Sequence, residues 1–401
     1  VVKKPEGYTT AKVDQIIQEY EKKSANEQQS TAKQYPNIIT VVNETFADIK
    51  VLGDFKTNED YMPYFHSLKK NCVTGYTYAS IVGGQTANTE FELLTGNTLG
   101  FLSAGTTAFQ LYIHGQMPSL VSNLKAEGYS GNKAMHPFNP YNYNRPAVYK
   151  DFGFTDFIDK FDFPKNVKRV REYISDEANV DRIISEYEKN RKKTDQPFYM
   201  YNMTIQNHSP YDKDAANFKQ IESSKYDAEA NRYLNLIKYS DDSLKQLTSY
   251  FEKCKEPTII LFLGDHQPRL TDEFMNKITN GQYQTWSSEQ MMKRYQVPFV
   301  IWANYDIKEQ HIEKTSMNYI QSILTKTAGV KMTGYQRFLN EVRKEVPTIT
   351  SQGYWGKNGK FYQINDKGSP YYGIIQKYRM IQYNMMFDKK NRRDSFFEVS
   401  K

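Results

Sequence analysis

Four short apolar runs constrain the fold of this 401-residue chain more than any other feature. They are NIITVVN at 37–43, FYMYNMTI at 198–205, TIILFLG at 258–264 and PFVIWAN at 298–304. Each has the length of a strand, and its nearly continuous apolar character indicates burial on both faces, as in parallel sheets covered by helices. Helical periodicity between the runs supports the same reading. We therefore predict an α/β fold with a mostly parallel central sheet flanked by helices.

The two ends of the chain differ from this central pattern. Residues 1–35 indicate a polar helix followed by a linker. After about Thr333, the stretch TITSQGYWGKNGKFYQI alternates around Gly and Asn turns, which predicts a small antiparallel sheet, and GIIQKYRMIQYNMMF predicts a closing helix. We predict three parts: an N-terminal helix and linker at 1–35, a catalytic domain at 36–332 and a C-terminal subdomain at 333–401.

Composition narrows the class of partner. The formal charge of +7 is modest for this length and is not gathered in a basic block, which disfavours nucleic acid as a partner. Only Cys72 and Cys254 are present, so we expect small buried thiols and no disulfide scaffold. No run approaches the roughly 18 apolar residues of a membrane span. The chain begins with Val1 and shows no signal-peptide pattern, so we expect a processed fragment whose membrane or export signal lies upstream.

Polar side chains with catalytic potential follow the predicted strands. Glu44 follows the first run, His208 the second, and Asp265 with His266 the third. Ligands of open α/β sheets bind beyond the carboxyl ends of strands. Two carboxylates and an imidazole meeting there suit a divalent cation such as Mn²⁺, Zn²⁺ or Mg²⁺, although each acid alone is more often a helix cap or a turn former.

Thr86, in IVGGQTANTEFELLTG at 81–96, has two interpretations. As a structural residue, it caps a helix that begins near Ala87, with Glu90 at a spacing close to that of a capping box. As a catalytic residue, the same position places a hydroxyl at a helix N-terminus, where free N–H groups favour a phosphate. A nearby base or cation would make that hydroxyl a nucleophile, and both interpretations can hold together.

The motifs in order resemble a known family. NETF from Asn43, GGQTANTEFELLTG from Gly83, NHSPY from Asn207 and GDHQP from Gly264 are similar to motifs in the extracellular catalytic domains of the lipoteichoic acid synthase family. Members of that family are phosphoglycerol transferases with a sulfatase and alkaline phosphatase-like fold. The resemblance covers roughly residues 36–385 and is strongest toward streptococcal enzymes that add glycerol phosphate to rhamnose wall polysaccharides.

The resemblance implies roles for individual residues. Glu44, Thr86, Asp265 and His266 match the family's metal ligands, usually for Mn²⁺, with Mg²⁺ or Zn²⁺ as alternatives, and Thr86 also matches the nucleophile. His208 matches a histidine that contacts the substrate phosphate and can protonate the leaving oxygen. HPFNPYNYNR matches the head-group segment, which implies that the glycerol phosphate lies near its members His136, Tyr143 and Arg145.

Two residues depart from the family pattern. Tyr143 replaces a tryptophan, and Gln85 replaces a frequent lysine. Both departures concern the acceptor more than the chemistry.

The resemblance also implies an overall function. We expect transfer of glycerol phosphate from phosphatidylglycerol to a cell-wall polysaccharide or teichoic acid, through a covalent glycerophospho-threonine. We expect the catalytic domain outside the cell membrane of a Gram-positive bacterium, held at the membrane surface by upstream transmembrane segments. One alternative is a phosphodiesterase or phosphatase with water as acceptor, and another is an inactive module that binds wall polymer or lipid head groups. Neither cysteine lies in the C-x-P-x-R pattern of sulfatases, which disfavours sulfate ester hydrolysis.

Overall fold

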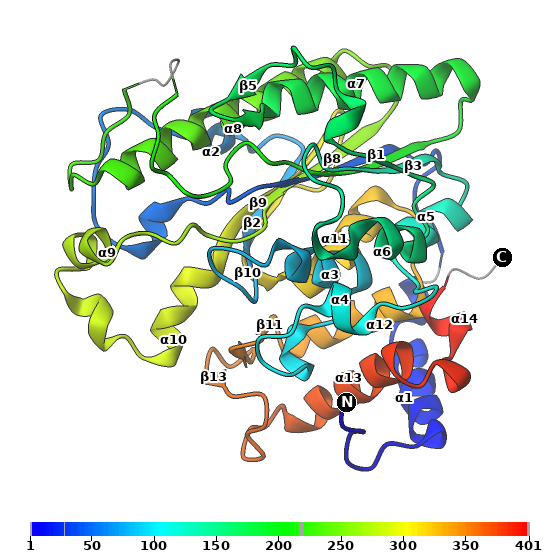
Figure 1. The fold of residues 1–401 in the computed structure, drawn as a ribbon. Helices are drawn as coiled ribbons and strands as arrows, with labels where there is room; N and C mark the ends of the chain where they lie inside the picture. Colours follow the sequence, from blue (N-terminus) through cyan, green and yellow to red (C-terminus); the bar gives the residue numbers. More distant parts are fainter. Residues whose placement is uncertain (1, 28, 216–219, 399–401) are drawn as a thin grey trace.

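A central sheet of eight strands divides the molecule in the computed structural model, which describes residues 2–27, 29–215 and 220–398 (Figure 1). The strand order is β10-β2-β9-β8-β1-β7-β3-β4. The strands are β1 (Asn37–Asn43), β2 (Cys72–Tyr78), β3 (Ser130–Met135), β4 (Asp156–Ile158), β7 (Phe198–Met203), β8 (Thr258–Gly264), β9 (Gln296–Ala303) and β10 (Gln310–Ser316).

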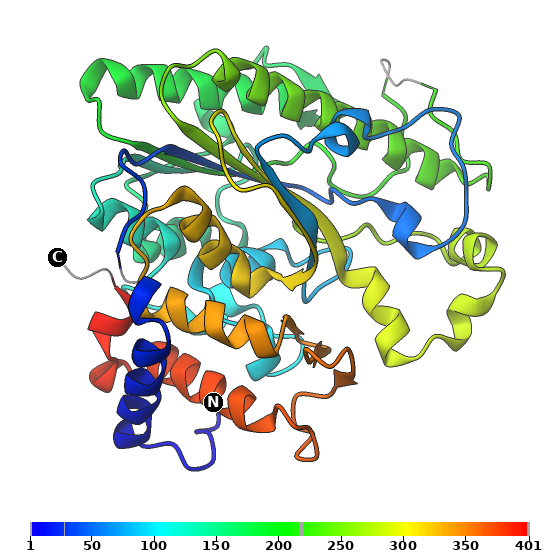
Figure 2. The same cartoon turned by 180° about the vertical axis from the view of Figure 1, so that it is seen from behind.

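Strand directions confirm the mostly parallel sheet, with one exception. Every pairing in the sheet is parallel except those of β9, which runs antiparallel to both β2 and β8. The run PFVIWAN was therefore correctly predicted as a strand, but the expectation that it runs parallel is wrong. The chain between β8 and β9 forms only short helices beyond one end of the strands (Figure 2). It therefore re-enters the sheet at the end where β8 stopped, and β9 runs in the opposite direction.

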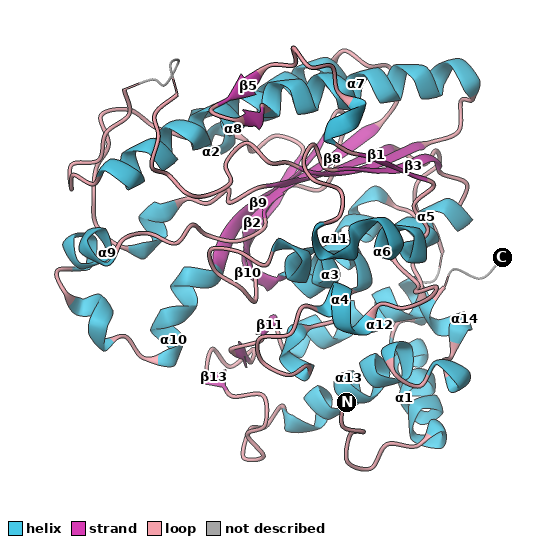
Figure 3. Cartoon of the chain, viewed as in Figure 1, coloured by secondary structure: helices cyan, strands magenta, loops and turns pink. Residues whose placement is uncertain are grey.

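Helices cover both faces of the sheet, as the coloring by secondary structure shows (Figure 3). Helices α7 and α8 lie above the sheet in this view, and α3, α5, α6, α11 and α12 lie below it. The α-helices are α1 (Thr10–Lys23), α2 (Pro63–Ser67), α3 (Thr86–Thr95), α4 (Ala108–Tyr112), α5 (Leu120–Ala126), α6 (Arg145–Phe152), α7 (Asp176–Lys193), α8 (Ala228–Glu252), α9 (Asp272–Thr279), α10 (Ser288–Met291), α11 (Met317–Ala328), α12 (Gly334–Glu345), α13 (Tyr372–Met386) and α14 (Asp394–Phe397).

The buried strands contribute side chains to two hydrophobic cores, one on each face of the sheet. In β8, Leu261 and Leu263 point into the core between the sheet and helices α3 and α11, whereas Ile260 and Phe262 point into the core between the sheet and helices α7 and α8. Successive side chains of a strand face opposite sides, so a strand covered on both sides must be apolar at nearly every position. This explains the unbroken apolar runs of the sequence.

The C-terminal region has the predicted elements. A three-stranded antiparallel sheet contains β11 (Thr348–Thr350), β12 (Gly353–Trp355) and β13 (Phe361–Tyr362), and α13 is the predicted closing helix. The predicted N-terminal helix is α1, which packs against α12 and α13. One core cluster joins residues from all three predicted parts, from Tyr8 to Phe397, and the division at residues 35 and 332 stays a prediction.

Cys72 and Cys254 are free thiols; Cys72 is buried, as expected, whereas Cys254 is partly exposed. Among the described residues, no helix combines the length and the apolar character that crossing a bilayer demands.

Gly264, the last residue of β8, has a close neighbour that explains its identity. A Cβ at this position would lie 1.8 Å from the carbonyl oxygen of Phe46. We predict that Gly264→Ala lowers the free energy of unfolding by about 3 kcal/mol, because backbone must move to admit the methyl group. Gly373→Ala in the first turn of α13, where nothing lies within 4 Å, serves as the control. Urea unfolding that gave the two variants equal stability would contradict this prediction.

Candidate functional site

The pairing of β1 with β8 places two carboxylates next to each other. Asn43 and Gly264 are partners in the parallel register, so Glu44 and Asp265 leave adjacent strands together. Both side chains are buried, and the backbone N–H of Thr45 donates to Oδ1 of Asp265 at 2.7 Å. Burial raises the pKa of Asp265, and the nearby charge of Glu44 raises it further. Two carboxylates that are buried next to each other require a positive charge nearby.

His266 supplies the imidazole of this cluster. Its Nε2 lies 3.2 Å from Asp265 Oδ2 and 3.5 Å from Glu44 Oε1. Burial opposes a charge on the ring, but Asp265 and Glu44 outweigh burial and raise the pKa of His266 above its ordinary value. The other ring nitrogen, Nδ1, lies 2.9 Å from the carbonyl oxygen of Gln267. Nδ1 therefore carries a proton and donates a hydrogen bond to this carbonyl, which turns Nε2 toward the two carboxylates.

Thr86 joins the same cluster from a different element. Its hydroxyl donates to Asp265 Oδ2 at 2.9 Å and lies 3.4 Å from His266 Nε2. The start of α3 is fixed to the segment after β8, because Thr89 Oγ1 donates to the carbonyl of Asp265 at 2.7 Å and Gly83 N donates to that of Gln267 at 2.9 Å. The loop after β2 therefore brings the hydroxyl to the end of β8.

The prediction that Thr86 caps α3 is wrong. The helix begins at Thr86 itself, and Gln85 occupies the N-cap position in a left-handed conformation with φ of 59°. The hydroxyl of Thr86 donates to Asp265 and does not cap the backbone N–H groups of the first turn. Glu90 does not close a capping box either, because its carboxylate points into the interior, as described below.

The cluster fits a divalent cation. One ligand atom each from Glu44, Asp265 and His266 lies within 4.8 Å of the others, and all three side chains are buried. Thr86 Oγ1 adds a fourth donor atom, an oxygen, to this set. Four donors of this mixed type are the ligands expected for Mn²⁺ or Zn²⁺. A bound cation would also neutralise the repulsion between the two carboxylates.

A cavity of about 400 Å³ opens above the cluster and contains every other predicted site residue. Glu44 and Thr86 lie in its wall, and so do the predicted substrate-binding residues His136, Tyr143, Arg145 and His208. The remaining lining residues are Gly83, Gly84, Gln85, Gln110, Phe138, Asn142, Ile205 and Ser209. The structure therefore brings together side chains from the ends of β1, β3, β7 and β8 and from the start of α3.

His208 is exposed to the cavity at the end of the β7 loop. Its Nδ1 lies 2.6 Å from the carbonyl oxygen of Ser209, and its ring stacks on Phe138 with centroids 6.3 Å apart. Arg171 holds the segment from the other side, donating to the carbonyls of Gln206 and His208 at 2.8 Å. With Nδ1 protonated, Nε2 is the nitrogen left for a substrate.

His136 differs from His208 in burial. It is buried, and its Nδ1 lies 2.7 Å from the carbonyl oxygen of Met203. Burial, together with the charge of Arg145, lowers the pKa of His136 to about 3. The ring is therefore neutral with its proton on Nδ1, so Nε2 can accept a hydrogen bond from a hydroxyl group.

Arg145 is held by the buried carboxylate of Glu90, a role that sequence reasoning did not find. Its Nη2 and Nε donate to Glu90 Oε2 at 2.8 and 3.2 Å, and both side chains are buried. The other oxygen, Glu90 Oε1, accepts from the hydroxyls of Tyr149 and Tyr201. Burial would lower the pKa of Arg145, but Glu90 outweighs this effect and keeps it raised. Three of the five guanidinium N–H groups are not taken by Glu90 and can bind an anion.

Three residues next to predicted site residues have unusual backbone conformations. Thr45, Gln85 and Asn144 have φ of 55°, 59° and 58°, and they adjoin Glu44, Thr86 and Arg145 respectively. Residues other than glycine seldom adopt this left-handed region, and β-branched residues least of all. Such strain tends to gather at functional sites, where the surrounding structure enforces it. The two departures from the family pattern, Gln85 and Tyr143, both line the cavity, and Tyr143 is also left-handed.

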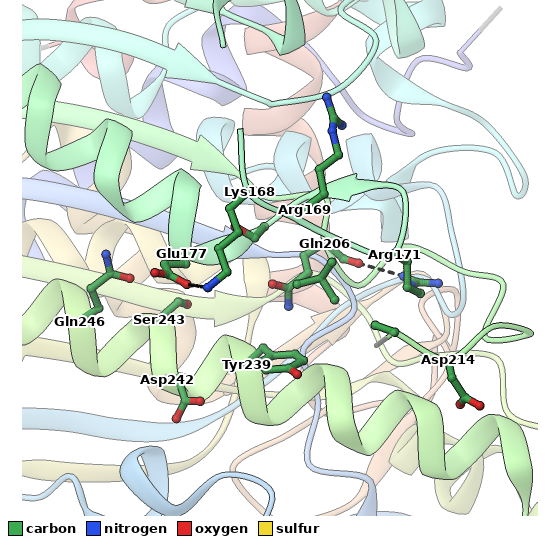
Figure 4. Close-up of a pocket in the computed structure, with 13 residues that line it drawn as sticks. Lys168, Arg169, Arg171, Glu177, Gln206, Asp214, Tyr239, Asp242, Ser243 and Gln246 are labelled. Atoms are coloured by element: carbon green, nitrogen blue, oxygen red, sulfur yellow. Dashed lines mark hydrogen bonds and ion pairs between the residues drawn. The ribbon is translucent and has the colours of Figure 1, made fainter. Parts of the chain in front are cut away.

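A second cavity of about 690 Å³ lies between α8 and the hairpin of β5 (Arg169–Val170) and β6 (Tyr173–Ile174) (Figure 4). Among its described lining residues, none is a predicted site residue. Lys168 pairs with Glu177 in its wall, and Arg171 donates to the carbonyl of Gln206 there. We assign no chemistry to this cavity, although its wall supports the segment that carries His208.

Comparisons with known proteins agree with the motifs. The family model for sulfatases matches residues 36–330. A putative cyclic beta-1,2-glucan modification protein of Rhizobium meliloti is 31% identical over 379 residues, which are 92% of this chain and 57% of that protein. A lipoteichoic acid synthase of Staphylococcus aureus is 28% identical over 193 residues, 46% of this chain and 28% of that protein. This chain therefore spans less than two thirds of these curated relatives.

A solved structure is similar along the whole chain. The Streptococcus pyogenes phosphoglycerol transferase GacH, in complex with sn-glycerol-1-phosphate, superimposes with a TM-score of 0.78 at 20% identity and covers 100% of both chains. At this identity the likeness establishes the fold. Together with the sequence relatives, it confirms the resemblance to the lipoteichoic acid synthase family and the fold class predicted from it.

The Glu90 network leads to a stability prediction. We predict that Glu90→Ala lowers the free energy of unfolding by about 3–5 kcal/mol, because it leaves the buried Arg145 cation unpaired. Glu177→Ala is a matched control, since its ion pair with Lys168 is more than half exposed on both side chains. We expect that control to change stability by about 1 kcal/mol or less. Equal losses for both variants in urea unfolding would show that Glu90 does not stabilise Arg145.

Proposed function

Because this chain belongs to the sulfatase family, we propose that it uses the family's fold for phosphoryl transfer, as a metal-dependent phosphoglycerol transferase. The observation that carries the proposal is the hydroxyl of Thr86, which lines the same cavity as Arg145, His136 and His208 and donates to Asp265. A hydroxyl in this position can attack a phosphate held above it. The missing C-x-P-x-R pattern argues against sulfate ester hydrolysis.

The first half-reaction forms a covalent intermediate. The N–H groups of Arg145 that are not engaged by Glu90 bind the phosphate of phosphatidylglycerol. Thr86 Oγ1 attacks phosphorus and its proton passes to Asp265 Oδ2, which already accepts the hydrogen bond. The bond from phosphorus to the diacylglycerol oxygen breaks, and protonated His208 gives that oxygen its Nε2 proton. The products are diacylglycerol and glycerophospho-threonine.

The second half-reaction reverses these roles. A hydroxyl group of the acceptor attacks phosphorus, and the now neutral His208 takes its proton through Nε2. The bond between phosphorus and Thr86 Oγ1 breaks, and Asp265 returns the proton to the threonine. The enzyme is then restored, and the acceptor carries glycerol phosphate.

Glu44, Thr86, Asp265 and His266 would hold the divalent cation, which we propose is Mn²⁺, with Mg²⁺ or Zn²⁺ as alternatives. Such an ion, when bound, lowers the pKa of a hydroxyl and offsets negative charge on a phosphate. Neutral His136 is placed to accept a hydrogen bond from a glycerol hydroxyl through Nε2, and Tyr143 contributes a further wall of the glycerol site.

The acceptor we propose is a cell-wall polysaccharide or teichoic acid. The names of the relatives support a glycan or a polyol phosphate polymer, since one is a putative glucan modification protein and another a lipoteichoic acid synthase. We also propose that the domain acts outside the cell membrane, where its lipid donor and polymer acceptor meet. The relatives come from Rhizobium as well as Staphylococcus, so their names alone do not select a Gram-positive organism.

The covalent step gives a direct test. We predict that the Thr86→Ala variant loses at least about 10³-fold in release of diacylglycerol from phosphatidylglycerol. Mass spectrometry of the wild-type protein, quenched during turnover without acceptor, should show one added glycerophosphate on the intact chain and, after digestion, on the peptide that contains Thr86. Ser103→Ala, a change on the loop after α3 outside the cavity, is the control. Retained activity in Thr86→Ala would rule out the covalent scheme.

The same assay separates transfer from hydrolysis. With a polysaccharide or teichoic acid acceptor present, a transferase moves glycerol phosphate to the polymer. Free glycerol phosphate in the same amount, with and without acceptor, would instead assign the alternative function of a phosphodiesterase that uses the same threonine.

Metal binding gives an independent test. We predict that Mn²⁺ at about 100 times its Kd raises the free energy of unfolding by about 2.7 kcal/mol. Asp265→Asn should lose most of this gain, because it removes a charged ligand, whereas Asp242→Asn on the solvent side of α8 should keep it. Thermal unfolding with and without Mn²⁺ measures the effect. A wild-type protein that gains no stability from Mn²⁺, Mg²⁺ or Zn²⁺ would favour the inactive binding module.

A further inference from the structure

Two buried asparagines that directly precede proposed site residues have no role in the proposed reaction. Asn43, at the end of β1, comes before Glu44. Asn207, in the segment after β7, comes before His208. Both asparagine side chains are fully buried, and Asn207 Nδ2 donates to Asn43 Oδ1 at 3.2 Å. Buried amides need partners for their remaining donors and acceptors, so the surroundings of this pair define its role.

A carboxylate and a hydroxyl from the helices above the sheet complete a closed ring with these amides. Asp176, the first residue of α7, accepts through Oδ2 from Asn43 Nδ2 at 3.0 Å and from Ser240 Oγ of α8 at 2.6 Å. The same Ser240 oxygen accepts from Asn207 Nδ2 at 2.7 Å. All four side chains are buried. We call Asn43, Asp176, Asn207 and Ser240 the polar bridge, because they join the end of β1 to the segment that carries His208.

The carboxylate of Asp176 sets the direction of the hydrogen bonds in the polar bridge. Burial, opposed by the hydrogen bonds from Ser240 and Asn43, raises the pKa of Asp176 to about 6, so the group is largely ionised at neutral pH. An ionised carboxylate only accepts, so Ser240 directs its proton, and Asn43 its amide N–H, toward it. Asn43 Oδ1 and a lone pair of Ser240 Oγ are then turned toward Asn207, which offers them its two amide hydrogens.

The start of α7 does not depend on the side chain of Asp176. The N-cap is Ser175, whose side chain accepts from the backbone N–H of Ala178 at 3.0 Å, and Glu177 supplies a second acidic group in the first turn. The other carboxylate oxygen, Asp176 Oδ1, is buried without a hydrogen-bond partner among the described residues. A buried carboxylate is costly, and the side-chain hydrogen bonds that this one makes belong to the polar bridge.

The segment that carries His208 is held from two sides. Arg171, between β5 and β6, donates to the carbonyls of Gln206 and His208 at 2.8 Å from the side of the second cavity (Figure 4). The polar bridge holds the side chain of Asn207 from the interior. Arg171 attaches the segment to a surface hairpin, whereas the polar bridge attaches it to β1, the strand that delivers Glu44.

We propose that Asp176 is a positioning residue that, through the other members of the polar bridge, fixes His208 relative to Glu44. The inference rests on the proposed function, in which His208 protonates the leaving oxygen of a phosphate held in the cavity. Proton transfer requires the imidazole within about 2.6–3.2 Å of that oxygen, and a misplacement of about 1 Å can cost roughly 10²-fold in rate. Asp176 does not line the cavity, so it acts through His208.

The leaving group of the donor tests this role. The test variant is Asp176→Ala, and the matched control is Asp181→Ala, at an exposed position of the same helix. With phosphatidylglycerol, we expect the kcat of Asp176→Ala to fall about 10- to 100-fold and that of the control to stay within about twofold. With a 4-nitrophenyl diester of glycerol phosphate, whose leaving oxygen departs without a proton, Asp176→Ala should stay within about threefold of the wild type. Equal losses on both donors would overturn the proposal.

A second variant leaves the carboxylate in place and decides the matter if Asp176→Ala does not fold. Ser240→Ala should show the same dependence on the leaving group. Its control, Ser243→Ala, removes another buried hydroxyl of α8, which donates to the carbonyl of Ser240 at 2.7 Å, and should show none. Asp176→Asn keeps one oxygen in the place of Oδ2 and should restore kcat to within about threefold of the wild type. An Asp176→Asn variant as slow as Asp176→Ala would contradict positioning through hydrogen bonds.

A double variant tests whether the effect passes through His208. Adding Asp176→Ala to His208→Gln should slow the release of diacylglycerol no further than His208→Gln alone, because the positioned side chain is already absent. Losses that multiply in the double variant would overturn the proposal.

Hydrogen exchange separates this inference from the proposed function, since it requires no turnover. The backbone N–H of His208 donates to the carbonyl of Ile205 at 3.0 Å, and mass spectrometry of peptides that cover 205–211 follows its exchange. Asp176→Ala and Ser240→Ala should raise the exchange rate about tenfold over their controls. Unchanged exchange would overturn the proposal. Raised exchange together with a fully active His208→Gln would contradict the acid role of His208 in the proposed function alone. Circular dichroism and thermal unfolding establish that the variants are folded.

Discussion

Two negative charges buried side by side are the constraint on which the rest of this site depends. Parallel strands that end in register deliver Glu44 and Asp265 to the same place, and neither can move away without breaking the β1–β8 pairing. The surrounding structure responds to that repulsion: His266 turns Nε2 toward the pair, and the Thr45 N–H and the Thr86 hydroxyl donate to Asp265. The proposed divalent cation would complete the charge balance. Gly264 belongs to the same arrangement, since the chain that carries Glu44 crosses it at backbone contact distance.

Helix α3 ties Thr86, the proposed nucleophile, to Arg145, the proposed phosphate-binding residue. Thr86 opens the helix, and Glu90, one turn later, fixes Arg145 through its carboxylate while two tyrosine hydroxyls hold the second oxygen. The same helix is anchored to the segment after β8 through Thr89. One short element therefore sets the distance between the Thr86 hydroxyl and the positive charge of Arg145. Such preorganisation lets fixed groups, in place of mobile water, stabilise charge that develops in the reaction.

Much of the fold could be predicted from sequence, because burial on both faces leaves a direct mark. The apolar runs located β1, β7, β8 and β9, and the polar residues after them located the carboxylate and imidazole cluster. The direction of β9 could not be predicted, since it depends on where the intervening short helices leave the chain. The cap assignment of Thr86 failed because Gln85 adopts a left-handed conformation that no local pattern indicates. Glu90 was missed for a similar reason: its partners Arg145, Tyr149 and Tyr201 come from elements that meet it only in the folded chain. The roles of the individual site residues remain predictions for experiment.

The left-handed backbone at Thr45, Gln85 and Asn144 bears on how this domain can be engineered. Each such conformation costs about 1–3 kcal/mol, and each directly adjoins a residue of the site. Glycine at these positions would relieve the strain and make the protein harder to unfold, but it would also free the neighbouring side chain to leave its place. Efforts to obtain a hardier domain therefore do best with substitutions on the distant helices, such as α1 and α13. At the three strained positions, a substitution that raises stability is expected to lower catalytic activity.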